Sequence, residues 1–144
     1  MKYKEKIIST HASLFQIGTE KDYSLIESSL GFAVSQGTTG TCAITPIEAA
    51  KFVAVLEFKA GIARGNHYHK AKVEYMCVLN GQLNCKLYPI DAPSASHNLI
   101  LTAGQILKIA PNCVHTFTAI GTNVFALEYS PQKFEQSDVI VIEE

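Results

Sequence analysis

The chain has 144 residues, a length that suits one domain with a sizeable buried core. Apolar residues make up 47% of it and charged residues 17%, which is typical of a folded globular protein and excludes a disordered chain. The formal net charge of -1 provides no basic excess for nucleic acid, and no apolar run is long enough to span a membrane.

The first fifty residues give a mixed pattern. The start, MKYKEKIIST, is charged and lacks the apolar stretch of a secretory signal, so we expect a cytoplasmic protein. The run KEKIIS predicts a short strand, whereas EKDYSLIESSLGFAV fits a helix or a strand equally well. After the turn-rich QGTTGT, the stretch TPIEAA predicts one helical turn with Pro46 at its start.

From Lys51 onward the pattern is that of short β-strands. Gly, Asn, Pro and Asp separate runs rich in apolar and β-branched residues: KFVAVLEFKAG, YMCVLNGQLNCKLY, NLILTAGQILKIA and TNVFALEYS. The pair Asn80-Gly81 predicts a tight hairpin between two such runs. Many short strands at near-regular spacing favour a sandwich or a barrel.

The cysteines form no Cys-x-x-Cys pair, so a cysteine zinc site is not expected. Without an export signal, the thiols are expected to be reduced. Cys77 and Cys85 lie within apolar runs, which is typical of small buried core residues. Cys113 lies close to a histidine in APNCVHTF, and its role is left open.

The stretch HYHKAKVE, residues 67–74, concentrates side chains that bind metals. In a strand, His67 and His69 project to the same face, and Glu74 begins the next run after a short connection. Two imidazoles and a carboxylate suit first-row transition ions, and His115 in APNCVHTF is the candidate for a further ligand. The other histidines, His11 and His97, fit solvated surface positions.

These residues carry a resemblance to the cupin family. The first cupin motif is Gly, five residues, His-x-His, three or four residues, Glu, six residues and Gly. Every fixed position matches here, in the order Gly61, IARGN, His67, Tyr68, His69, KAKV, Glu74, YMCVLN, Gly81.

The second cupin motif is Gly, five residues, Pro-x-Gly, two residues, His, three residues and Asn. Here it reads GQILKIAPNCVHTFTA, from Gly104 to Ala119, with His115 at the histidine position. Ala110 replaces the usual Pro. Asn112 replaces the turn Gly, a suitable exchange because Asn adopts left-handed backbone angles more readily than most residues. Ala119 replaces the final Asn and its side-chain hydrogen bond.

The resemblance implies an all-β fold: a double-stranded β-helix, or jelly-roll, cupin barrel with a short mixed N-terminal segment. In this division residues 51–144 form the barrel, and residues 1–50 pack on it or swap with a second copy. Cupins commonly dimerise through barrel faces and exchanged N-terminal strands, so the expected assembly is a homodimer.

The resemblance also implies a divalent transition metal ion inside the barrel, with Fe, Mn, Ni and Zn all compatible with the donor set. One or two open positions on such an ion can take water, dioxygen or a substrate oxygen. The ligands carried over from the two motifs are His67, His69, Glu74 and His115.

A second, shorter resemblance points to a different chemistry. ARGNHYHK is similar to the RG-x-H-x-HK stretch of cupins that isomerise or epimerise nucleotide-linked keto sugars. There an arginine meets the phosphates and a histidine moves protons next to a ketone; the matching residues are Arg64, His67 and His69. Those enzymes generally lack a complete metal set, and a His bound to metal cannot abstract a proton. A solvent-exposed loop charge is the other interpretation of Arg64, and Lys70 and Lys72 are expected to be solvated.

Alternation along the strands predicts which side chains face inward. Glu74, Met76 and Val78 share one face, and His115 and Phe117 share another that should meet it. Apolar walls around a metal exclude water and favour small organic ligands or dioxygen, although the same side chains also fit plain core. The predicted substrate contacts are Arg64, Met76, Val78 and Phe117.

Three functions remain open, and whether the chain is an enzyme is itself open. The first is a small metal-dependent enzyme, an oxygenase, isomerase or lyase, acting on an oxyanion-bearing organic substrate. The second is a nucleotide-sugar isomerase or epimerase. The third is a non-catalytic cupin that binds a small ligand. All three require a small-molecule partner, and none involves nucleic acid or a membrane.

Overall fold

The structure is a computed structural model, and it describes residues 4–16, 26–27, 33–37, 40–44 and 50–143. Nearly all regular structure in these residues is β-strand, as predicted. A 3₁₀ turn, Gln136–Asp138, is the one helical element of this part of the chain. The helical turn predicted at Pro46 lies outside the described residues.

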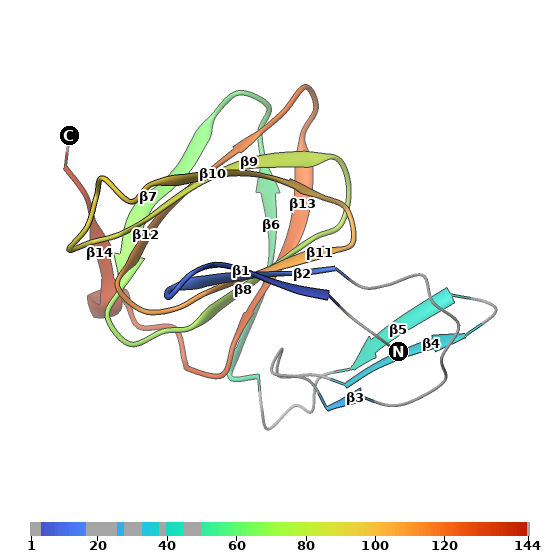
Figure 1. Cartoon of the computed structure of the whole chain (residues 1–144). Coiled ribbons are helices and arrows are strands. Elements are labelled where there is room, and N and C mark those ends of the chain that lie inside the picture. Colours follow the sequence, from blue (N-terminus) through green and yellow to red (C-terminus); the bar gives the residue numbers. More distant parts are fainter. Residues whose placement is uncertain (1–3, 17–25, 28–32, 38–39, 45–49, 144) are drawn as a thin grey trace.

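Six strands form one antiparallel sheet (Figure 1). In spatial order they are β1 (Lys4–Ser9), β2 (Ala12–Gln16), β11 (Gln105–Ile109), β8 (Glu74–Val78), β13 (Val124–Ser130) and β6 (Phe52–Phe58). The predicted strand KEKIIS is β1, and β2 joins it to the rest of the sheet through β11.

Five strands form a second antiparallel sheet. Their order is β10 (His97–Thr102), β9 (Gln82–Pro89), β12 (Cys113–Ala119), β7 (Ala63–His69) and β14 (Val139–Val141). A separate three-stranded sheet contains β3 (Ile26–Glu27), β4 (Ala33–Gly37) and β5 (Gly40–Ile44).

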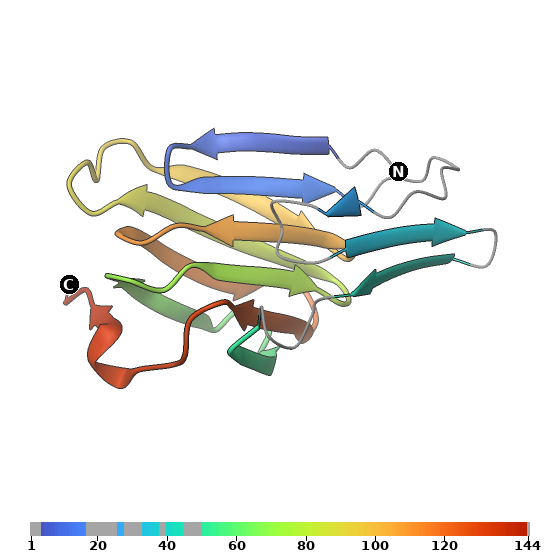
Figure 2. The ribbon, with the colours of Figure 1, turned by 90° about the horizontal axis from the view of Figure 1, so that it is seen from below.

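The two larger sheets face each other and enclose the core (Figures 1 and 2). From β6 to β9 successive strands alternate between the two sheets, and the alternation resumes from β10 to β14. This winding confirms the predicted jelly roll. Strand pairing in the described residues runs within each sheet, so the barrel is an open sandwich rather than a closed cylinder.

Side-chain alternation builds the core between the sheets. In β9, Leu83, Cys85 and Leu87 are buried, whereas Asn84 and Lys86 between them are exposed. The facing sheet contributes buried apolar side chains that include Phe58, Met76, Val78, Leu107, Ile109 and Ala126. Burial of this apolar surface is the main stabilising contribution to such a sandwich.

The predicted hairpin at Asn80-Gly81 is wrong. The strands on either side, β8 and β9, belong to different sheets and do not pair. Gly81 does have a positive φ of 67°, as a tight turn requires, and Asn80 accepts a hydrogen bond from Phe125 N. The turn residues therefore form a corner that carries the chain from one sheet to the other.

A β-bulge interrupts the pairing of β7 with β12. Gly65 lies opposite Thr116 and His67 lies opposite His115, so Asn66 is an extra residue on β7. Gly65 and Asn66 have positive φ angles of 110° and 58°. Because of the extra residue, the inward and outward faces of β7 exchange at this point.

No helix in the described part of the chain is long and apolar enough to cross a membrane. The division at residue 50 and the homodimer stay predictions.

The close approach of β7 to β12 makes Gly65 a sensitive position. A Cβ at Gly65 would lie 2.7 Å from the backbone oxygen of His115, and the φ of 110° disfavours any side chain. We expect Gly65→Ala to lower the free energy of unfolding by about 3 kcal/mol.

Gly121→Ala is the matched control. Gly121 has a φ of 76° but no atom within 4 Å of an added Cβ, so the loss should be about 1 kcal/mol. Denaturant unfolding of both variants measures the difference. Equal losses of unfolding free energy in the two variants would contradict a steric clash between a Cβ at residue 65 and the backbone of β12.

Candidate functional site

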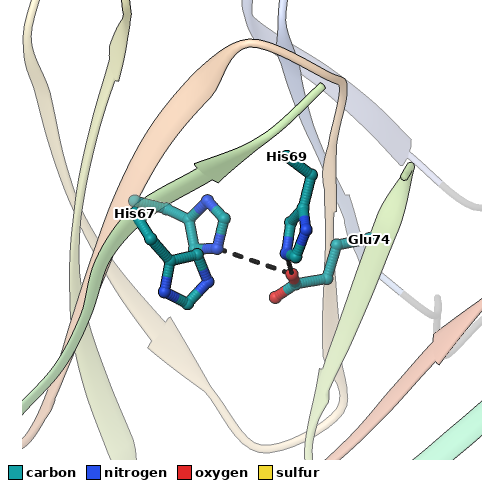
Figure 3. Close-up of side chains that lie close together, drawn as sticks. His67, His69 and Glu74 are labelled. Carbon is teal, nitrogen blue, oxygen red and sulfur yellow. Dashed lines mark ion pairs between the residues drawn. The ribbon is translucent and has the colours of Figure 1, made fainter. Parts of the chain in front are cut away.

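The four predicted metal ligands come together between the two sheets. His67 and His69 come from β7, Glu74 begins β8, and His115 lies in β12. One donor atom from each lies within 4.8 Å of the donors of the other three. Figure 3 shows the rings of His67 and His69 and the carboxylate of Glu74 directed toward a common point.

The buried carboxylate of Glu74 is the centre of this group. Its Oε2 lies 3.3 Å from Nε2 of His69 and 3.4 Å from Nε2 of His115. Burial alone would raise the pKa of Glu74, but the neighbouring His115, His69 and Lys72 hold it well below its ordinary range. For His115, burial opposes the charged form, yet Glu74 outweighs it and raises the pKa.

His67 differs from its neighbours because it is only half-buried. Burial, followed by the nearby His115, lowers the pKa of His67 from 6.5 to about 4, so its imidazole is neutral at pH 7. Its ring centroid lies 4.7 Å from that of His115 and 5.2 Å from that of His69. A neutral imidazole can bind a metal or accept a proton.

A backbone carbonyl oxygen lies next to the imidazole of His115, and a carboxylate oxygen lies next to that of His69. Nδ1 of His115 lies 3.0 Å from the carbonyl oxygen of Cys113, and Nδ1 of His69 lies 3.5 Å from Oδ2 of Asp138. Within the described residues, His115 Nε2 and His69 Nδ1 are buried without a hydrogen-bond partner. Nε2 of His115, which contacts Oε2 of Glu74 at 3.4 Å without a hydrogen bond, lies within the cluster of donors, so the donor set fits a divalent transition ion.

The cluster lies in a cavity of about 250 Å³. Of the predicted substrate contacts, Arg64, Met76 and Phe117 line this cavity. Val78 does not line it; it lies in the core with 1% of its surface exposed. The full lining is Phe52, Leu56, Phe58, Arg64, Gly65, His67, His69, Lys72, Glu74, Met76, His115, Phe117, Glu128, Phe134, Gln136 and Val139.

The bulge explains why Arg64 reaches the cavity. His67 is the third residue after Arg64, a spacing that would place them on opposite faces of a regular strand. The extra residue Asn66 exchanges the faces, so both side chains line the cavity. Arg64 is exposed, and its guanidinium carbon lies 5.7 Å from the centre of the Phe58 ring.

The expectation that Lys72 is solvated is wrong. Its side chain is 3% exposed and lines the cavity. The ammonium forms an ion pair with Glu128 and lies 3.9 Å from Oε2 of Glu74. Lys72 precedes Glu74 by two residues, so the alternation that placed Glu74 inward could also have placed Lys72 there. Lys70 is exposed, as expected.

The C-terminal segment, residues 131–143, contributes residues that the sequence reasoning missed. Asp138 accepts hydrogen bonds from the backbone N–H groups of Lys70, Ala71 and Lys72. These amides keep the pKa of Asp138 lowered although its partial burial acts in the opposite direction. Within the run SDVIVIEE, Val139–Val141 form β14, which pairs with β7 beside the histidines. No motif marked Asp138 as part of the site.

The described cysteines take no part in the cluster. Cys85 and Cys113 are buried, and burial raises the pKa of the Cys113 thiol to about 11. A thiol with a raised pKa is a poor nucleophile at neutral pH. The reading of Cys77 and Cys85 as apolar packing residues therefore extends to Cys113.

Known structures share this fold. A 3,4-ketoisomerase, QdtA from Thermoanaerobacterium thermosaccharolyticum, solved as a double mutant with TDP, is 19% identical with a TM-score of 0.67 over 92% of this chain and 88% of that one. A dTDP-4-dehydrorhamnose 3,5-epimerase from Bacillus anthracis, solved with TDP and PPi, is 15% identical, with a TM-score of 0.66 over 96% and 84%. NovW, a 4-keto-6-deoxy sugar epimerase from Streptomyces spheroides, is 9% identical, with a TM-score of 0.70 over 99% and 74%.

Identities this low establish a shared fold and leave the reaction open. No curated protein matches the sequence. A family model does match: the one described as "Polysaccharide biosynthesis C-terminal domain" covers residues 43–139, well over half of the chain and all four residues of the cluster. With the complete first cupin motif, the histidine of the second motif and the jelly roll in place, the chain belongs to the polysaccharide biosynthesis C-terminal domain family within the cupin superfamily.

Proposed function

We propose that this protein is an isomerase or epimerase that acts on a nucleotide-linked keto sugar. The observation that carries the proposal is the position of His67, a half-buried imidazole with a lowered pKa in the same cavity as Arg64 and the His115–Glu74 pair. A base, a second proton-holding group and a cation then surround one space. These are the groups that proton transfer next to a carbonyl requires.

The shared fold supports this choice of substrate class. The structures that it resembles include a ketoisomerase and two epimerases of keto sugars, and another structure of QdtA was solved with TDP-4-keto-6-deoxyglucose. At about 250 Å³ the cavity is smaller than the roughly 300–1,000 Å³ of sites that bury a drug-sized ligand, so it would take the sugar and not the whole sugar nucleotide. The nucleotide would therefore lie at the mouth, where the exposed guanidinium of Arg64 can pair with its phosphates.

The proposed reaction begins with removal of a proton from the carbon beside the ketone. Neutral His67 accepts this proton, and the resulting enediol or enolate is then protonated at a different carbon or on the opposite face. His115, which Glu74 and the carbonyl of Cys113 orient, is the proposed second proton-holding group. Protonation at a different carbon moves the ketone, whereas protonation on the opposite face inverts a centre.

The second candidate is a metal-dependent enzyme acting on an oxyanion-bearing substrate. Convergence of four donors within 4.8 Å, with a buried imidazole nitrogen of His115 that forms no hydrogen bond, favours it. His67, His69, Glu74 and His115 would hold the ion, which when bound would supply Lewis-acid polarisation of a substrate oxygen. Asp138 would orient His69 through Nδ1, as carboxylates commonly do for metal-bound histidines.

We expect the protein to convert TDP-4-keto-6-deoxyglucose in deuterated water, with the solvent label read by NMR. Label at C4 would indicate a 3,4-ketoisomerase, whereas label at C3 and C5 would indicate a 3,5-epimerase. His67→Gln should lower kcat by about 10²- to 10⁴-fold because it removes the base. His97→Gln, which changes a histidine outside the cavity, is the control and should keep the wild-type rate. No label with this compound or a uridine-linked analogue would contradict the proposal.

The pH profile tests the role of His67 independently. Because the pKa of His67 in the ligand-free protein is lowered to about 4, its neutral form persists through the weakly acidic range. For protein freed of metal by a chelator, kcat/KM should remain level as the pH falls through 6.5 and decline only near 4. A decline centred near 6.5 would mean that the essential base is an unperturbed imidazole and not His67.

Elemental analysis tests the metal centre. Protein purified without chelators should contain about one equivalent of a transition metal per chain, and His69→Ala should lose it, if the second candidate is correct. Turnover that survives complete metal removal would exclude the metal-dependent candidate and leave proton transfer as the role of the histidine cluster. Turnover that is lost and then restored by adding one metal would mean that the isomerase or epimerase reaction is itself metal-dependent.

A further inference from the structure

We propose that Lys72 is a catalytic residue whose ammonium binds the ketone oxygen of the substrate and stabilises the negative charge that develops there. This inference rests on the proposed function, because the ketone oxygen belongs to the keto-sugar substrate that is proposed for this cavity. It assigns a role to the pair formed by Lys72 and Glu128, neither of which belongs to the histidine cluster.

The burial of Lys72 is costly for the fold. Its side chain is 3% exposed and that of Glu128 is 11% exposed, and both line the cavity. Removing two charges from water carries a large desolvation penalty, and well-packed apolar side chains commonly stabilise such a position as well or better. A requirement for packing alone therefore does not explain a charged pair at the cavity wall.

The contacts of the ammonium leave room for a ligand. Glu128 accepts a hydrogen bond from Nζ, and the Phe52 ring covers another direction with its centre 4.4 Å away. Oε2 of Glu74 lies 3.9 Å from Nζ, beyond hydrogen-bond distance. An ammonium has three N–H donors, and Lys72 lines the cavity of about 250 Å³. Phe52 in turn stacks on Phe134 at 5.7 Å, so aromatic rings limit the approach of water to this wall.

The loop that carries Lys72 is fixed before any ligand binds. Asp138 accepts hydrogen bonds from the amides of Lys70, Ala71 and Lys72, at 2.9 to 3.1 Å. The next amide, that of Val73, donates to Gln132 Oε1 at 2.9 Å. Four consecutive amides are thus held by side chains of the C-terminal segment. A donor fixed in advance stabilises developing charge without reorganisation at the moment of reaction.

The chemical step is balanced within the site. His67 takes the proton, the electron pair of the broken C–H bond forms a C=C bond, and the carbonyl π electrons move to oxygen. Lys72 donates a hydrogen bond to this oxyanion. When a proton returns to the same carbon on the opposite face, the electron pairs move back to re-form the ketone. When it is added to the former carbonyl carbon, the proton of the neighbouring hydroxyl passes to the oxyanion while that hydroxyl oxygen forms the new C=O bond. In both cases the ammonium is unchanged, so the step needs no oxidant or reductant.

The test uses the double variant Lys72→Met/Glu128→Leu, which removes the pair without leaving one charge buried alone. With TDP-4-keto-6-deoxyglucose, kcat should fall by about 10²- to 10³-fold, the cost of losing one oxyanion donor. KM and the Kd for TDP should change by less than about 3-fold, because the phosphates lie outside this wall. Lys70→Met, on the same loop but exposed, should behave as wild type.

The single variant Lys72→Arg supplies a second measurement, because it keeps a cationic donor and should recover part of kcat. A double variant with wild-type kcat would overturn the role of Lys72 while leaving the proposed function intact. Equal losses in kcat and in TDP affinity would also overturn it, since they would indicate a structural role. Absence of turnover in the wild-type protein would overturn both proposals.

Discussion

The site depends on the close contact between the backbones of β7 and β12 at Gly65. Only a residue without a side chain fits there, because an added Cβ would overlap the carbonyl oxygen of His115. The contact accompanies the bulge at Asn66, and the bulge exchanges the faces of β7. As a result, Arg64 and His67 line the same cavity despite a spacing that regular alternation would separate.

Two neighbouring groups of charged and polar side chains line the cavity. One is the carboxylate of Glu74 between His69 and His115, and the other is the pair of Lys72 and Glu128. Each carboxylate has a cationic or imidazole neighbour, which is what makes so many polar groups tolerable between two apolar sheets. The half-buried His67 lies at the open side of this arrangement, where a ligand can reach it.

The sequence predicted the jelly roll and the convergence at the histidines because these depend on fixed motif spacings. It did not predict the path of the chain at Asn80-Gly81, because a positive-φ turn looks the same in a hairpin and in a corner between sheets. Lys72 was misread since a lysine in a short connection between two strands looks solvated until its partner Glu128 is known. That partner lies 56 residues later, a separation that local patterns do not reveal.

The pairing of β14 with β7 has a consequence for the order of assembly. A ribosome releases the histidine strand some seventy residues before the segment that carries Asp138 and Val139. Until that segment emerges, the amides of residues 70–73 lack their acceptors and Lys72 has no fixed position. A nascent chain can therefore form most of the sandwich before Gln132 and Asp138 emerge and fix the loop that carries Lys72.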